Sequence, residues 1–191
     1  GSAESRPGRE MMRAIHQFVA GFAPGDAISN EALVLRRLFR DWGYASEIVS
    51  EPGHISPDLR REARDISTAA DLCRPDDVVL LHLSVGSVVN DVFAGLPCRK
   101  ALLYHNITPA RYFDLVNKKT AYSLEKGRQQ MRALAQAAAV NLADSRFNAD
   151  ELTALGYRDV KVLPLILDLA AMKSAPDGGT LRRFGDGRTQ V

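Results

Sequence analysis

The sequence has no long apolar run, few cysteines and almost no surplus of charge. Its 191 residues include 25 Lys and Arg and 23 Asp and Glu, which leaves a formal net charge of +2. A balance of this kind gives no reason to expect nucleic acid as a partner, although a local basic patch could still touch anionic headgroups. No apolar stretch approaches the ~20 residues of a membrane-spanning helix, and residues 1–10 lack the apolar centre of a signal peptide. We therefore expect a cytoplasmic protein with no nucleic-acid partner, and we leave peripheral contact with the inner face of a membrane open.

Only two cysteines are present, Cys73 and Cys98, and both lie among apolar residues. This usage is typical of a reduced cytosolic chain and argues against a disulfide framework. Several motifs that mark particular chemistries are also absent: G-x-G-x-x-G, the P-loop, H-E-x-x-H, C-x-x-C and G-x-S-x-G. No metal ligands are evident either, so the sequence predicts no metal site.

What the sequence does contain is an alternation of predicted strands and helices. Strands are predicted over residues 12–19, 44–50, 77–83, 99–105, 139–144 and 160–166, and helices over residues 59–72, 87–96, 114–138 and 148–155. A further helix carries the apolar stripe Leu35, Leu38, Phe39 and Trp42 and ends at Gly43. Six strands separated by helices predict an α/β fold with a Rossmann-like, doubly wound and mostly parallel six-stranded sheet.

The two ends of the chain differ from this pattern. Residues 1–10 begin with Gly-Ser and are interpreted as a tag, which leaves residues 11–169 as the α/β domain. Residues 170–191 mix proline, glycine and charge like a linker, and their last seven residues, GDGRTQV, resemble a turn followed by a new strand. We expect this strand to open a second domain that has been removed.

Ligands of open α/β sheets bind beyond the carboxyl ends of the strands, near the point where the strand order reverses. The loop after the first predicted strand contains Gly21, Gly25 and Asp26 and leads into a helix. Glycine lets a ligand approach the backbone, and a helix N-terminus offers free N–H groups to an anion. These three residues are candidate substrate contacts, although an ordinary strand-to-helix turn explains them equally well.

The third predicted strand ends in HLSVGS, which contains His82, Ser84 and Gly86. All three are candidate substrate-binding residues because they lie at the expected edge of the sheet. His82 falls inside an apolar run, so a core histidine with a satisfied hydrogen bond is the alternative. Ser84 and Ser87 also fit as caps of the next helix.

The fourth predicted strand ends on Tyr104, His105 and Asn106, an unusual finish for a stretch that is otherwise apolar. An imidazole at the carboxyl edge of a strand can donate to a hydroxyl or phosphate oxygen, and so can an amide. His105 is therefore the candidate catalytic residue, and Tyr104 and Asn106 are candidate substrate-binding residues.

Two other polar groups have simpler explanations. Asp144, Ser145 and Asn148 follow the fifth predicted strand and fit the start signal of a helix. Six arginines are most simply read as solvated helix faces, with anionic lipid as the alternative: Arg36, Arg37, Arg40, Arg60, Arg61 and Arg64.

Three segments carry a family resemblance. They are HQFVAGFAPGDAISNEALVLRRLFRDWGY (residues 16–44), HLSVGSVVNDVFAGLPCRKALLYHNITPARYF (82–113) and ADSRFNADELTALGYRDVKVLPLILD (143–168). In this order they resemble the N-terminal half of a GT-B glycosyltransferase of the retaining "group one" class, also called family four. The family's hinge segment usually ends in n-G-v-D, and LPLILD retains only Asp168 of that pattern.

The resemblance implies a two-domain hexosyltransferase-like enzyme whose active site lies in a cleft between Rossmann-like halves. This half would hold a small-molecule or glycan acceptor, while the missing half would hold the nucleotide-sugar donor. His105 resembles a cleft histidine that contacts the transferred sugar, and the loop over residues 21–26 would approach the donor phosphates or the acceptor. Such enzymes generally work without a bound metal or a tightly bound cofactor. The resemblance further implies a role in bacterial polysaccharide or glycoconjugate synthesis and no activity for this chain alone.

Two other classes remain open. A nucleotide-dependent oxidoreductase would need a phosphate-binding fingerprint after the first strand, which is missing, and an acidic residue at the end of the second strand. Glu51 lies near that position but matches it only weakly. A non-catalytic, flavodoxin-like binding or interaction domain would be complete as it stands. The donor sugar, the acceptor and the oligomeric state are not indicated by the sequence.

Overall fold

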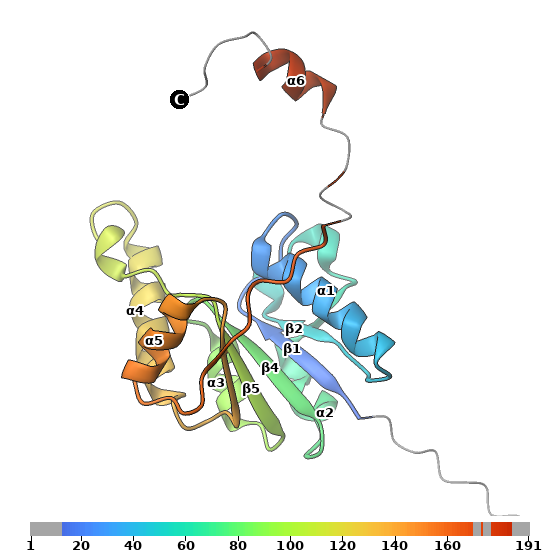
Figure 1. Cartoon of the computed structure of the whole chain (residues 1–191), viewed down its shortest axis with the longest axis vertical. Helices are drawn as coiled ribbons and strands as arrows, with labels where there is room; N and C mark the ends of the chain where they lie inside the picture. The colour runs from blue at the N-terminus through green and yellow to red at the C-terminus, as the bar shows by residue number, and fades with distance from the viewer. Residues whose placement is uncertain (1–12, 170–172, 174–176, 185–191) are drawn as a thin grey trace, which may run out of the picture.

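A computed structural model describes residues 13–169, 173 and 177–184 of the chain, shown in Figure 1. Its sheet has seven parallel strands in the order β3-β2-β1-β4-β5-β6-β7. The strands are β1 (Ile15–Val19), β2 (Ile48–Ser50), β3 (Ala63–Asp65), β4 (Val78–Leu83), β5 (Arg99–Tyr104), β6 (Val140–Ala143) and β7 (Lys161–Val162). The α-helices are α1 (Ala27–Asp41), α2 (Ala69–Leu72), α3 (Val88–Gly95), α4 (Lys118–Ala133), α5 (Arg146–Ala154) and α6 (Gly178–Phe184). The predicted Rossmann-like α/β fold is confirmed.

The strand order reverses between β1 and β4 at the centre of the sheet. Both strands are buried on both faces, as expected of a parallel sheet covered by helices, which is why β4 reads as the apolar run VVLLHL. The crevice beyond the carboxyl ends of β1 and β4 is therefore the place where a ligand is expected.

The two faces of the sheet are covered by different helices. Along β4 and β5, Leu81 and Leu102 join a core with buried residues of α3, α4 and α5, whereas Leu80 and Leu103 pack against α1. This division follows from the two-residue period of a strand, because successive side chains point to opposite faces. Figure 1 shows α1 separated by the sheet from α3, α4 and α5.

Two sequence predictions differ from the observed elements. The helix predicted over residues 59–72 instead contains the short edge strand β3, a 3₁₀ turn (Ile66–Thr68) and α2, so the sheet has one more strand than predicted. Arg64 and Asp65 of β3 are exposed, and an edge strand of this kind has no apolar pattern to reveal it. The last strand pairs only over Lys161–Val162 because Pro164 has no N–H to offer to the ladder.

The predicted helix over residues 114–138 is shorter than expected. A separate 3₁₀ turn (Ala110–Tyr112) precedes the predicted range, and residues 113–116 form a turn. Helix α4 begins after Asn117, whose side chain accepts a 3.0 Å hydrogen bond from the N–H of Thr120, and it ends at Ala133. The predicted tag at residues 1–10 and the strand-like GDGRTQV lie outside the described residues. Helix α6 lies within the expected linker, residues 170–191.

None of the helices in the described part combines the length and apolar character needed to cross a bilayer.

Candidate functional site

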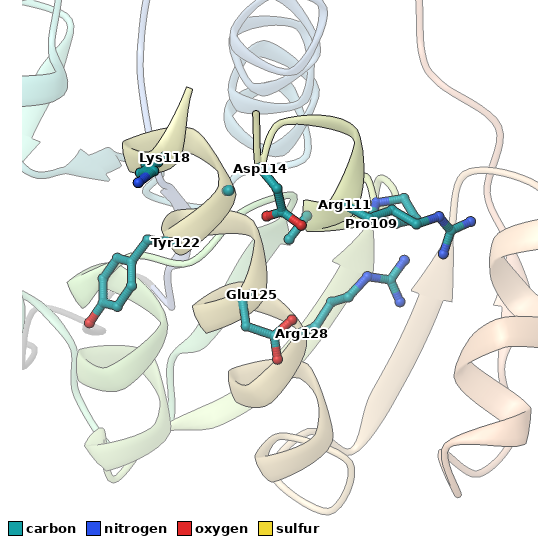
Figure 2. A pocket seen from close by; sticks show the side chains of 9 residues that line it. Pro109, Arg111, Asp114, Lys118, Tyr122, Glu125 and Arg128 are labelled. Carbon is teal, nitrogen blue, oxygen red and sulfur yellow. The ribbon is translucent and has the colours of Figure 1, made fainter. Parts of the chain in front are cut away.

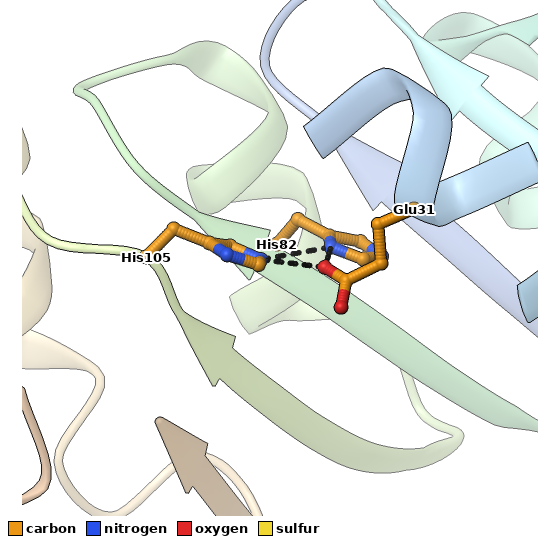
Figure 3. A group of neighbouring side chains, drawn as sticks. All are labelled: Glu31, His82 and His105. Atoms are coloured by element: carbon orange, nitrogen blue, oxygen red, sulfur yellow. Dashed lines mark hydrogen bonds and ion pairs between the residues drawn. The ribbon is translucent and has the colours of Figure 1, made fainter. Parts of the chain in front are cut away.

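A buried polar cluster lies at the carboxyl ends of β1, β4 and β5, on the face that α1 covers (Figure 3). Gln17 and His82 belong to the strands and point toward α1, while Glu31 belongs to α1 and His105 directly follows β5. Gln17, Glu31 and His82 are fully buried, and the His105 side chain is 3% exposed. The cluster therefore lies at the switch point of the sheet but is closed to solvent.

Hydrogen bonds fix the orientation of the two rings. The side-chain amide of Gln17 donates to the carbonyl of Ala32 at 2.9 Å, so its oxygen is the acceptor for Nε2 of His82 at 3.0 Å. Once Nε2 carries the proton, Nδ1 of a neutral His82 is an acceptor. It lies 3.0 Å from Nε2 of His105, and the ring planes are within 7° of one another. His105 therefore donates to His82 in the neutral state.

Glu31 faces both rings and also holds the chain beyond β7. Its Oε1 accepts a 3.0 Å hydrogen bond from the N–H of Ile166. Its Oε2 lies 3.6 Å from Nε2 of His105 and 3.8 Å from Nδ1 of His82 and has no hydrogen-bond partner among the described residues. Burial raises the pKa of Glu31, while the Ile166 N–H lowers it and the nearby Asp144 charge raises it.

Burial acts on the histidines in the opposite direction. It lowers the pKa of His82 well below its usual value, and the neighbouring His105 lowers it further. Burial also lowers the pKa of His105 to about 4, although the carboxylates of Asp144 and Asp26 act to raise it. Both rings are therefore neutral at pH 7 and present lone pairs rather than positive charge.

His105 has the position that the sequence predicted, at the carboxyl edge of β5. The backbone N–H of His105 donates to the carbonyl of Leu83 at 3.0 Å, and the ring atom Nδ1 lies 3.7 Å from Oδ2 of Asp144. The imidazole is nevertheless almost fully covered, so direct contact with a substrate requires the covering groups to move. Its catalytic role stays a prediction.

Asn106 is the exposed member of this edge. Its backbone has a φ of 74°, a left-handed conformation that few residues other than glycine adopt, Asn among them. Strained positions of this kind occur often at functional sites. The amide is accessible to a ligand, and its role in binding stays a prediction.

Tyr104 is fully buried and has a packing role in this structure. Its hydroxyl donates to Oε2 of Glu151 at 2.5 Å and accepts from the N–H of Ile107 at 3.0 Å. These bonds stabilise the bend of the chain after β5. Contact with a substrate would require this residue to leave the core.

Replacing Tyr104 by phenylalanine is expected to lower the free energy of unfolding by about 1–3 kcal/mol, because the buried N–H of Ile107 loses its acceptor. Urea unfolding followed by circular dichroism measures the loss. Tyr122→Phe is the control, since that ring is 72% exposed. Equal stabilities of the two variants would contradict the packing role.

The loop after β1 is exposed, as a ligand-binding loop requires. Gly25 has a φ of 77°, which explains the glycine, and Asp26 caps α1 by accepting from the N–H of Ser29 at 2.8 Å. The helix cap thus accounts for Asp26 without a ligand, and Gly21 is exposed with ordinary contacts. Gly25 also borders a hollow of about 740 Å³ between α1 and the chain beyond β7, lined in addition by Arg37, Leu59 and Ile166.

Gly86 is required for a close contact between the loop after β4 and helix α4. Its N–H donates to the carbonyl of Ser123 at 3.0 Å, and a Cβ at this position would lie 2.6 Å from the backbone nitrogen of Gly127. The contact explains the glycine by packing. Ser84 is half-buried beside it, and Ser87 caps α3 by accepting from the N–H of Val89 at 3.1 Å.

A second hollow, of about 760 Å³, lies in front of α4 and was not predicted (Figure 2). Lys118, Tyr122 and Arg128 of α4 line it together with Arg111 and other residues of the preceding segment. The sequence did contain a signal for this surface, a local surplus of positive charge: six basic and two acidic residues lie between positions 109 and 132. Tyr112 and Tyr122 are 63% and 72% exposed, which adds aromatic surface to the basic one.

The arginines predicted to form solvated helix faces are largely used within the chain. Arg37 pairs with Asp168 at 2.7 Å, Arg40 donates to the carbonyl of Ser46 at 2.7 Å, and Arg36 is buried against Glu62. Arg64 belongs to β3 and Arg60 and Arg61 to the preceding turn, so these three do not lie on a helix.

Comparison with known proteins gives matches to solved structures only; no protein family model and no curated protein matches the sequence. An alpha-glucosyltransferase in complex with UDP-glucose and DNA containing an abasic site matches with a TM-score of 0.56 and 14% identity, over 84% of this chain and 44% of that one. A second structure, an alpha-glucosyltransferase with UDP and a 13-mer DNA containing a HMU base, matches with a TM-score of 0.53 and 14% identity, over 85% and 44%. The chain shares the Rossmann-like fold of these GT-B enzymes. It spans less than half of their length.

The expectation that nucleic acid is not a partner is contradicted by these matches, because the glucosyltransferases that share the fold are in complex with DNA. That expectation was drawn from a net charge of +2 averaged over 191 residues. An average of this kind conceals a local surplus such as the one around α4.

Proposed function

We propose that this chain is the acceptor-side half of a nucleotide-sugar-dependent retaining glycosyltransferase of the group-one type. The observation that carries the proposal is the structural match over 84% of the chain to an enzyme in complex with UDP-glucose. The position of His105 and Asn106 beyond the carboxyl end of β5 adds support, because ligands of this sheet type bind there. A donor with a diphosphate leaving group is the substrate class, and a role in polysaccharide or glycoconjugate synthesis is part of the proposal.

In the proposed reaction, the bond between the anomeric carbon and the diphosphate oxygen breaks and an acceptor oxygen forms the new bond on the same face. The proton of the acceptor passes to the departing diphosphate. This half contributes positioning and hydrogen bonds rather than a nucleophile.

The proposal is tested by supplying the full-length protein with a panel of nucleotide sugars and measuring release of nucleoside diphosphate. Proton NMR of the product then gives the anomeric configuration, which we expect to be retained. The 191-residue chain alone is the control and is expected to show no turnover. Turnover by that chain, or no donor cleavage by the full-length protein with any sugar nucleotide, would contradict the proposal.

A nucleic-acid acceptor is the second candidate, favoured by the surface around α4. Between positions 109 and 132 basic residues exceed acidic ones by four, twice the surplus of the whole chain. Lys118 and Lys119 are exposed at the start of α4, close in sequence to the exposed ring of Tyr122. Cations attract phosphates, and exposed aromatic rings stack on bases.

If this surface binds DNA, a Lys118→Ala/Lys119→Ala variant is expected to reduce the salt dependence of binding. Each phosphate contact contributes about 0.9 to the slope of log K against log salt, so the slope should fall by about 1.8. Fluorescence anisotropy of a labelled 13-mer duplex at several salt concentrations measures it. Arg13→Ala/Arg99→Ala is the matched control, because both residues are exposed and lie at the amino-terminal ends of β1 and β5, opposite the carboxyl ends from which the chain leads to α4. Equal slopes for the two variants would exclude this surface and leave a glycan or small molecule as the acceptor.

A further inference from the structure

Three atoms of the kind that bind metals converge in the buried cluster. Oε2 of Glu31, Nδ1 of His82 and Nε2 of His105 lie within 4.8 Å of one another. Figure 3 shows the carboxylate directed at the two rings from α1, with the rings coming from β4 and the end of β5. The three elements that meet at the switch point thus each contribute one potential ligand.

The distances between these atoms match a small cation. The edges of the triangle are 3.0, 3.6 and 3.8 Å. Three edges define a circle through the atoms, and its radius is about 2.0 Å, close to the zinc–nitrogen and zinc–oxygen distances of roughly 2.0–2.2 Å. The nitrogen–nitrogen edge is slightly shorter than the ~3.3 Å of a tetrahedral site, which a small rotation of either ring corrects.

The cluster contains a buried acceptor without a donor. Oε2 of Glu31 is fully buried and has no hydrogen-bond donor among the described residues. A buried carboxyl oxygen that lies beside two rings without accepting a hydrogen bond is unfavourable on its own. A divalent cation satisfies all three atoms at once.

The outer nitrogens of both rings lie beside oxygen atoms of the kind that accept hydrogen bonds from metal-bound histidines. A ligating histidine commonly donates its second N–H to a carboxylate or carbonyl, which fixes its orientation. Nε2 of His82 lies 3.0 Å from the side-chain oxygen of Gln17, and Nδ1 of His105 lies 3.7 Å from Oδ2 of Asp144. When a cation replaces the proton between the rings, that proton moves to Nδ1 of His105, and the new N–H can donate a hydrogen bond to the nearby Oδ2 of Asp144.

We propose that Glu31, His82 and His105 form a site for a divalent transition-metal cation, with zinc as the best fit. Two imidazoles and one carboxylate favour zinc over calcium or magnesium, which prefer oxygen ligands. Three protein ligands leave one coordination position for water or a ligand oxygen. The site joins α1 to β4 and the end of β5. The proposal stands on the cluster itself and does not depend on glycosyl transfer.

The test uses the 191-residue chain, stripped of metal with a chelator and titrated with zinc in competition with a chromophoric chelator. We expect one equivalent to bind and the melting temperature to rise with zinc concentration. Glu31→Gln and His105→Ala should each weaken binding by more than about 100-fold, since loss of an outer partner alone typically costs 10–100-fold. Asp144→Asn should fall within that smaller range. His54→Ala is the control, because His54 is exposed and outside the cluster.

A measurement on the unmodified chain keeps the test independent of variant folding. Long-range ¹H–¹⁵N NMR reports the protonation and ligation of each imidazole nitrogen. Zinc should perturb Nδ1 of His82 and Nε2 of His105 and leave the rings of His16 and His54 unchanged. Absence of stoichiometric binding, or binding that leaves the His82 and His105 nitrogens unperturbed, would overturn the proposal.

Discussion

Gly86→Ala is expected to lower the free energy of unfolding by about 3 kcal/mol, the upper part of the usual range for overpacking. A Cβ at Gly86 would lie 2.4 Å from the carbonyl oxygen of Ser123 and 2.6 Å from the backbone nitrogen of Gly127. Both neighbours are backbone atoms of α4, so they cannot rotate away as a side chain can. Either the loop after β4 or the whole helix has to shift.

The reciprocal variant tests the same contact from the helix. Gly127→Ala places a Cβ 2.5 Å from the nitrogen of Gly86, although alanine favours an isolated helix by about 1 kcal/mol. We expect net destabilisation in urea unfolding, against the direction of helix propensity. Gly95→Ala is the control, because no atom lies within 4 Å of its added Cβ. If all three variants unfold at the same urea concentration, the contact is not as close as the structure has it.

His105→Ala is expected to lower turnover of the proposed two-domain enzyme by at least ~10-fold, a loss of about 1.4 kcal/mol in transition-state stabilisation. The ring lies just beyond the carboxyl end of β5, with Nε2 hydrogen-bonded to His82 and Nδ1 facing Asp144. Its removal leaves Nδ1 of His82 without a partner and alters the crevice edge that we assign to the substrate.

Initial rates over a range of donor concentrations separate the effects on kcat and KM. A role in positioning the transferred sugar should lower kcat more than it raises KM. His54→Ala is the control, since His54 is exposed and its only ion pair is with Glu51 in the described part of the chain. Unchanged kinetics with a folded protein would leave His105 as a structural residue.

The sheet could be predicted from the sequence because most of its strands are buried. Val78–Leu83 and Arg99–Tyr104 read as apolar runs, and those runs identify central parallel strands. Ala63–Asp65 could not be predicted, because an exposed three-residue edge strand owes its conformation to pairing with β2 rather than to its own composition.

The site was predictable only in part. The positions of His82 and His105 follow from strand ends, and the two-residue period of a strand places both on the α1 face. Glu31 gave no signal, because a single glutamate on an amphipathic helix reads as a solvent-exposed residue, and only the crossing of α1 over the sheet buries it. The packing role of Gly86 was equally hidden, since its neighbour Gly127 lies forty-one positions away and belongs to another element.

The two oxygens of Glu31 face in different directions, with one toward the histidines and the other on the N–H of Ile166. Ile166 lies on the stretch by which the polypeptide leaves the sheet after β7, and Asp168 two positions later is tied to Arg37 of the same helix. The carboxylate of Glu31 thus connects the buried histidines to the segment that follows β7. We expect a change in the protonation or ligation of Glu31 to alter its hydrogen bond to Ile166, and with it the attachment of this segment to α1.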